Sequence, residues 1–77
     1  MIIDRKDAQE IADGLNMILS EAEAYGESVE LGDDGMYVEQ GTEEEQKRAR
    51  QLNNLIGDAR AFEVPLEWNG GEWEVGE

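Results

Sequence analysis

The chain of 77 residues holds twenty Asp and Glu against six Lys and Arg, so its formal net charge is -14. A chain of this length forms one domain, residues 1–77. It contains no cysteine and no histidine, which excludes disulfides and removes the commonest general base and the usual zinc ligands. Its charge repels phosphates and anionic lipid, so we expect no direct binding of nucleic acid or membranes. With no long apolar run and no signal-peptide pattern, the sequence predicts a cytoplasmic protein.

Two amphipathic helices are predicted. Apolar residues three and four positions apart predict the first helix, whose start Asp4 or Asp7 can cap and which Gly26 can end. Its apolar stripe consists of Ala8, Ile11, Leu15, Ile18, Ala22 and Tyr25. Thr42 and Glu45 form a capping-box pattern at the start of the second helix, where acidic residues meet the positive end of the helix dipole. The apolar residues of this helix are Ala49, Leu52, Leu55, Ile56 and Ala59.

A hairpin is predicted after each helix, because apolar residues alternate with polar ones on both sides of a glycine-rich turn. In the first hairpin the turn is 32–35, and the alternating apolar residues are Val29, Leu31, Met36 and Val38. In the second hairpin the turn is 69–71, and the apolar residues are Phe62, Val64, Leu66, Trp68, Trp73 and Val75.

The two halves of the chain resemble each other. A shift of 37 positions, without a gap, superposes similar residues along helix, loop and hairpin. Identical pairs include Ala12 with Ala49, Leu15 with Leu52, Asn16 with Asn53, and Val38 with Val75. This match favours a tandem duplication, while convergence of two amphipathic units on one pattern stays open.

The predicted fold class is α+β, in the order αββαββ. One αββ unit of about 37 residues cannot bury its apolar faces alone, whereas two units, about 4–40 and 41–77, can. We therefore expect a two-layer sandwich in which two helices pack on one face of a four-stranded antiparallel sheet. Because the core is thin for a domain of this size, a homodimer that shares it is an alternative to a monomer.

Alternation along the predicted strands sorts the charged side chains onto the face of the sheet that the helices leave open. The outward residues are Glu30, Tyr37, Glu39, Glu63, Glu67, Glu72 and Glu74. Glu67 lies opposite Glu74 if the loop has four residues, and opposite Glu72 if it has two. Like charges directly opposed on a sheet are destabilising, so a requirement for folding alone does not explain them.

Two explanations of the acidic face are left open. In the first, the charge serves solubility, as in a small acidic interaction or dimerisation module, including one from a halophile. In the second, carboxylates that recur about every 6.6 Å along a strand stand in for successive phosphates. Such a face would meet the lysines and arginines of a nucleic-acid-binding protein.

No catalytic residue, cofactor or metal site is predicted. The exposed glutamates lack the apolar pocket that raises the pKa of a catalytic acid, and no histidine activates a hydroxyl. Asp33 and Asp34 lie between strands rather than in the helix-flanked loop of an EF-hand. Asn16 and Asn53 are interpreted as polar boundary residues, and Lys47, Arg48 and Arg50 as partners of acids within the chain.

In size, charge and lack of Cys and His, the chain resembles the small acidic inhibitors of bacteriophages, namely anti-CRISPR and anti-restriction proteins of the DNA-mimic kind. The resemblance spans the whole chain and rests on no motif. It implies a non-enzymatic protein in the host cytoplasm that blocks the nucleic-acid channel of a CRISPR effector complex or other defence nuclease. The expected contact residues are Glu30, Glu39, Glu63, Glu67, Glu72 and Glu74, with Tyr37 as aromatic anchor and Asp33 and Asp34 as second choice.

Overall fold

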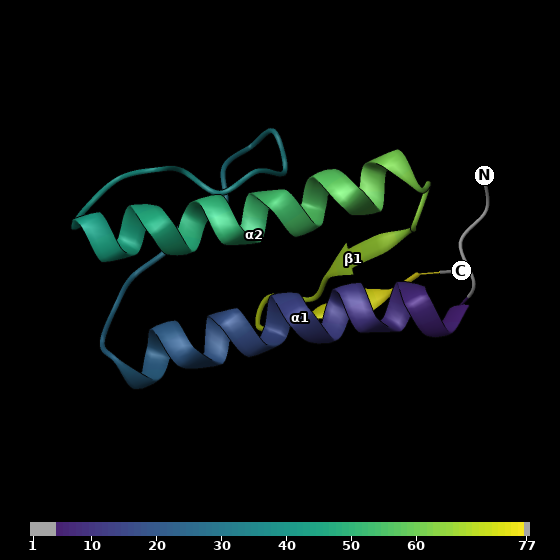
Figure 1. Cartoon of the computed structure of the whole chain (residues 1–77), viewed down its shortest axis with the longest axis horizontal. Helices are drawn as coiled ribbons and strands as arrows, with labels where there is room; N and C mark the ends of the chain where they lie inside the picture. The colour runs from purple at the N-terminus through teal and green to yellow at the C-terminus, as the bar shows by residue number, and fades with distance from the viewer. Residues whose placement is uncertain (1–4, 77) are drawn as a thin grey trace.

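The computed structural model describes residues 5–76 and shows a small α+β protein. Two helices, α1 (Arg5–Ala24) and α2 (Glu43–Ala61), precede two short strands, β1 (Leu66–Trp68) and β2 (Trp73–Val75). The helices run in opposite directions, and the strands return along them as a hairpin (Figure 1). The predicted tandem αββαββ sandwich is wrong, because the described residues contain one antiparallel sheet of two strands rather than four.

The helices pack through small and branched apolar residues. Leu15 of α1 and Leu52 of α2 are fully buried, and Ala12 and Ala49 beside them are also inaccessible to solvent. Gly14 allows the close approach of the helices, since a Cβ atom there would lie 3.2 Å from a methyl group of Leu55. The apolar stripes predicted for both helices therefore face each other and form most of the core. Tyr25 is an exception: the sequence predicts it in the stripe of the first helix, but it lies beyond the end of α1 and is 75% exposed.

The start of α2 confirms the predicted capping box. Thr42 Oγ1 accepts a hydrogen bond from the backbone N–H of Glu45 at 3.1 Å, and the Glu45 carboxylate accepts one from Thr42 N–H at 2.9 Å. These two bonds satisfy N–H groups that have no partner within the helix.

Both helices end in a Schellman turn, which requires one residue in the left-handed conformation. At the end of α2, Val64 N–H donates to the carbonyl of Ala59 at 2.7 Å, and α1 ends with the same pattern around Gly26. The left-handed residues are Gly26, with φ 69°, and Glu63, with φ 58°. Glu63 therefore lies in a turn and not on the predicted strand.

The second hairpin has the longer of the two loops that the sequence allows. Glu67 pairs with Glu74 and Trp68 with Trp73, so four residues, 69–72, form the loop. The side chains of Trp73 and Val75 point towards the helices, while Glu67 and Glu74 are exposed on the opposite face. Each strand has three residues.

The first predicted hairpin is reduced to a turn with one bridge, between Leu31 and Tyr37. Five residues, 32–36, separate this pair, one more than in the second hairpin. The extra residue shifts the alternation, so Tyr37 is 5% exposed and Val38 is 40% exposed. The predicted outward position of Tyr37 and inward position of Val38 are therefore wrong.

Two asparagines each hold one edge of a hairpin to a helix. Asn53 of α2 accepts from Tyr37 N–H at 2.7 Å and donates to its carbonyl at 3.0 Å. Asn16 of α1 binds Trp73 in the same way, at 2.7 and 2.9 Å. These backbone groups point away from their own hairpin, where a third strand would need them. Because side-chain amides occupy them, these two edges are closed to a further strand.

Candidate functional site

The ion pairs among the described side chains, those of residues 7–76, use few of the acidic residues. Arg48 pairs with Glu21 and Glu27, and Arg50 pairs with Glu39. Three of the twenty acidic residues are therefore neutralised by a cation in the described part of the chain. The net charge of -14 gives the molecule a long-range attraction for cationic surfaces.

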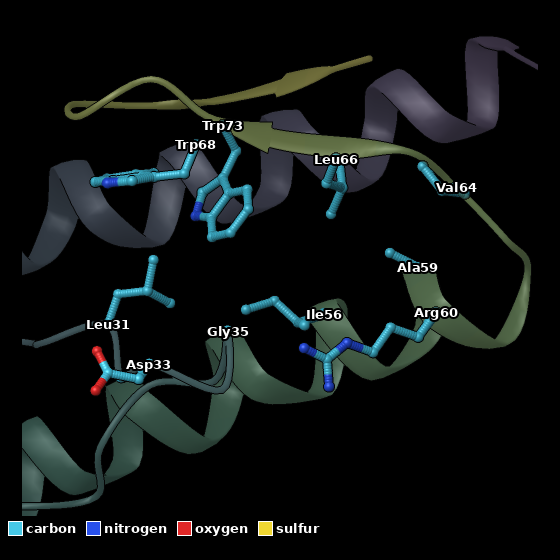
Figure 2. A pocket seen from close by; sticks show the side chains of 11 residues that line it. Leu31, Asp33, Gly35, Ile56, Ala59, Arg60, Val64, Leu66, Trp68 and Trp73 are labelled. Carbon is cyan, nitrogen blue, oxygen red and sulfur yellow. The ribbon is translucent and has the colours of Figure 1, made fainter. Parts of the chain in front are cut away.

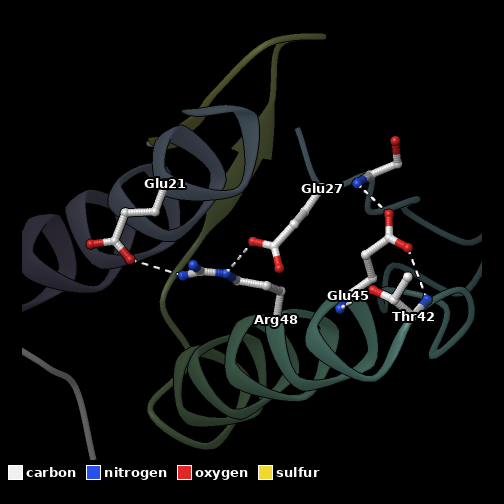
Figure 3. A network of polar contacts seen from close by, with 6 residues as sticks. Glu21, Glu27, Thr42, Glu45 and Arg48 are labelled. Atoms are coloured by element: carbon white, nitrogen blue, oxygen red, sulfur yellow. Dashed lines mark hydrogen bonds and ion pairs between the residues drawn. The ribbon is translucent and has the colours of Figure 1, made fainter. Parts of the chain in front are cut away.

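Arg48 joins α2 to the end of α1, as Figure 3 shows. Its Nη1 atom donates to Glu21 at 2.8 Å and its Nε atom to Glu27 at 3.0 Å, and the guanidinium lies 5.7 Å from the centre of the Tyr25 ring. Hydrogen bonds to Glu21 and Glu27 raise the pKa of Arg48 above its usual value, and the bond to Glu21 has the larger effect. This supports the interpretation of Arg48 as a partner of acids within the chain.

Glu45 ties the segment between the helices to the start of α2. Its second carboxylate oxygen accepts from the backbone N–H of Ser28 at 2.6 Å, in addition to the bond from Thr42 (Figure 3). These bonds hold the pKa of Glu45 below its usual value, and the bond from Thr42 has the larger effect. Glu45 is therefore an anionic structural residue rather than a contact for a partner.

The second hairpin presents two opposed, exposed glutamates, and the helix that β2 contacts, α1, carries an exposed aspartate. Glu67 and Glu74 lie opposite each other on its exposed side, and Asn69 Nδ2 donates to Glu74 at 2.9 Å. Asp13 is exposed and lies one helical turn before Asn16, whose amide holds the edge of β2. We call the three carboxylates of Asp13, Glu67 and Glu74 the outer face.

The other predicted contact residues of the second half do not extend this surface as a row along a strand. Glu63 lies in the turn after α2, and Glu72 lies in the hairpin loop. Because each strand has three residues, each carries one outward glutamate. The predicted repeat of carboxylates along a strand, at phosphate-like spacing, is therefore absent from this hairpin.

The predicted residues of the first half are engaged in local contacts. Gln40 donates to Glu30 at 2.9 Å, and Glu39 pairs with Arg50 at 3.1 Å. The side chain of Asp34 accepts from the backbone N–H of Met36 at 3.0 Å. The nine predicted residues thus occupy several parts of the surface and the core instead of one face.

Tyr37 lies in the core rather than at a contact surface. Trp73 Nε1 donates to the Tyr37 hydroxyl at 3.0 Å, so the two residues held by asparagines also bind each other. Burial raises the pKa of Tyr37 above its usual value, and the hydrogen bond from Trp73 offsets part of that effect. Tyr37 therefore cannot act as the aromatic anchor predicted from the sequence.

Asn16 and Asn53 are the structural residues that sequence reasoning missed. Both were interpreted as polar boundary positions, yet each makes two hydrogen bonds to a distant backbone. The available signal was the recurrence of the same residue type, beside the apolar stripe, at positions 37 apart. A side-chain amide can act as both donor and acceptor, which suits a strand edge.

A cleft of about 450 Å³ opens between the two hairpins and α2 (Figure 2). Its walls are largely apolar and include Leu31, Ile56, Leu66, Trp68 and Trp73. The indole rings of Trp68 and Trp73 are 5.3 Å apart and tilted by 50°. No sequence pattern pointed to this cleft, because it depends on how the first turn lies over α2.

Neither helix within residues 5–76 has the length and apolar composition needed to cross a membrane. No cluster of three or more acidic side chains suited to a metal ion occurs in the same part of the chain. Comparison of the sequence with protein-family models and curated proteins, and of the structure with solved structures, finds no match.

Proposed function

We propose that this protein binds a basic nucleic-acid-binding surface of another protein and competes with nucleic acid for it. In this proposal it is a non-enzymatic inhibitor of a CRISPR effector complex or another defence nuclease and acts in the cytoplasm. The observation that carries the proposal is the surplus of carboxylates that no cation within residues 7–76 neutralises.

Part of this surplus lies on the outer face, where it lowers the stability of the fold. Glu67 and Glu74 are directly opposed on neighbouring strands, an arrangement that costs stability. Asn69 donates to one of them, but its amide is neutral and leaves both charges in place. A cationic partner would relieve this repulsion, so the complex would have favourable charge contacts that the isolated protein lacks.

Nucleic-acid-binding proteins are the class of partner that best matches such a surface. Their channels carry lysines and arginines that neutralise phosphates, and the same cations can meet carboxylates. The mimicry here is one of charge rather than of regular spacing, because the short strands do not provide a row of carboxylates. Affinity should therefore depend strongly on ionic strength.

The test is an affinity column that carries the whole protein. Lysate of the host cell is applied at low salt, and short duplex DNA or RNA is then used to elute the bound proteins. We expect nucleic-acid-binding proteins to be retained and to be released by the nucleic acid. If saturating nucleic acid leaves every retained protein on the column, the proposal is wrong.

Two charge-matched variants make the test specific. The first combines Asp13→Asn, Glu67→Gln and Glu74→Gln, which removes the outer face. The second combines Glu43→Gln, Glu44→Gln and Asp58→Asn, which removes three exposed carboxylates from α2. The first variant should retain much less of the partner than the second. Equal losses would show that total charge alone, and not the outer face, determines binding.

A further inference from the structure

The cleft between the hairpins is an aromatic pocket that is open to solvent. Trp68 is 39% exposed although its ring lines the cleft beside Trp73, and Leu31 lies on the opposite wall (Figure 2). A volume of about 450 Å³ is within the range of sites that bind small ligands or single side chains. Exposed aromatic rings around such a pocket are typical of the anchors in protein interfaces.

Two residues of opposite charge, Asp33 of the first turn and Arg60 of α2, line the cleft (Figure 2). Arg60 Nη2 donates to the carbonyl of Asp34 at 2.9 Å, so this arginine connects α2 to the tip of the first turn. The rim at Asp33 is open to a cation. An arginine or lysine there could also stack on the exposed ring of Trp68.

We infer that this cleft receives an aliphatic side chain from a basic segment of the protein partner. The inference rests on the proposed function and adds an apolar contact to the attraction between charges. The net charge of -14 selects a cationic segment, and the apolar walls select an uncharged side chain within it. Burial of one leucine side chain should strengthen binding by about tenfold or more.

The probe is a ten-residue peptide of lysine and arginine with one central leucine, and its match has serine in place of leucine. The protein has two tryptophans, and both line the cleft, so its two indole N–H signals in a nitrogen-15 NMR spectrum report occupancy. We expect the leucine peptide to shift both signals and to bind about tenfold more tightly than the serine peptide.

Two variants separate the cleft from the fold. Trp68→Ala should reduce the affinity for the leucine peptide to that for the serine peptide, while the remaining indole signal of Trp73 shows that the core is intact. Asp33→Asn, an exposed change, should weaken binding of both peptides by about twofold to threefold. If Trp68→Ala does not fold, the comparison of the two peptides on the wild-type protein still decides the question.

Several results would overturn the inference. Equal affinities for the leucine and serine peptides, with unchanged indole signals, would mean that the cleft is not used. If both peptides then still bound in a salt-dependent way, the proposed function would survive without the cleft. Equal binding of a leucine peptide built from glutamate would show that the cleft does not select a basic segment. Indole shifts that depend on protein concentration alone would show that a second copy fills it.

Discussion

The two turns that follow the helices, residues 29–38 and 66–75, have similar patterns of apolar residues but different structures. The second forms a sheet of three residue pairs, whereas the first retains one bridge, between Leu31 and Tyr37. In each, a helix asparagine is hydrogen-bonded to the backbone of the segment that follows the loop, at Tyr37 and at Trp73. The shared feature is thus the attachment to a helix, and the difference is the number of residues in the loop.

This difference shows how strongly a hairpin depends on its register. With five residues rather than four in the loop, Tyr37 instead of Met36 occupies the place across from Leu31. A shift of one residue moves every following side chain to the other face. The alternation predicted from the sequence is therefore confirmed for Glu67, Trp73 and Glu74 in the second hairpin and wrong for Tyr37 and Val38 in the first.

The largest effect should come from removing the asparagines. Asn16→Ala and Asn53→Ala each leave one N–H and one carbonyl without a partner in a partly buried place, which should cost about 2–4 kcal/mol of unfolding free energy. Urea titration measures the loss. Asn54→Ala, at an exposed position of α2, is the control and should be nearly neutral. If Asn53→Ala is also nearly neutral, the first turn is not held in the way described.

Tyr37→Phe should have the next largest effect. It removes the acceptor of the buried Trp73 indole N–H and should cost about 1–2 kcal/mol. Tyr25→Phe is the matched control, because Tyr25 is 75% exposed. Equal stabilities of the two variants would contradict the role of the Tyr37 hydroxyl in joining the two turns.

Tyr37 also predicts a dependence of stability on alkaline pH. Its folded pKa is raised above the unfolded value of about 10. The stabilising contribution of the neutral phenol is therefore complete below about pH 10 and is lost as the pH rises through the folded pKa. Stability of the wild type should fall more steeply above pH 10 than that of Tyr37→Phe. Parallel pH profiles would count against burial of this hydroxyl.

A smaller effect is expected where the two turns leave their helices. Glu63 adopts the left-handed conformation that Gly26 adopts without strain. Glu63→Gly should therefore stabilise the protein by about 0.5–1 kcal/mol, after allowance for the greater freedom of glycine in the unfolded chain. Gly26→Ala should destabilise it by a similar amount. Thermal unfolding of both variants measures the difference, and a loss of stability in Glu63→Gly would contradict the Schellman turn after α2.

The smallest effect concerns the opposed charges of the second hairpin. Glu67→Gln should raise stability by about 0.2–1 kcal/mol at low salt, and added salt should reduce the gain. Glu44→Gln is the control, because its negative charge lies in the first turn of α2 and favours the helix. If Glu67→Gln has no effect on stability or binding at low salt, the outer face is ordinary solvated surface.

Much of the local structure could be predicted from the sequence, because it depends on neighbours along the chain. The periods of Leu15 and Leu52 and the capping box at Thr42 follow from local patterns. The sequence left a two-residue and a four-residue loop open in the second hairpin, and the structure has the four-residue loop. The position of Tyr37 could not be predicted, because one loop residue decides it. The roles of Asn16 and Asn53 could not be predicted either, because their hydrogen-bond partners are distant in the sequence and come within reach only when the turns pack on the helices.

The candidate site divides in the same way. Exposure of Glu67 and Glu74 was predicted from alternation within one hairpin. The contribution of Asp13 could not be predicted, since it requires β2 to lie beside α1. The cleft at Trp68 likewise requires the first turn to fold over α2.

Binding of the captured partner in a series of salt concentrations, with and without saturating nucleic acid, shows whether the protein competes with nucleic acid through its charge. We expect an affinity that falls steeply as salt rises, that disappears when nucleic acid fills the partner's channel, and that depends on the outer face. An affinity that is unchanged by saturating nucleic acid would contradict competition for a shared basic surface. An affinity independent of salt would contradict recognition by charge.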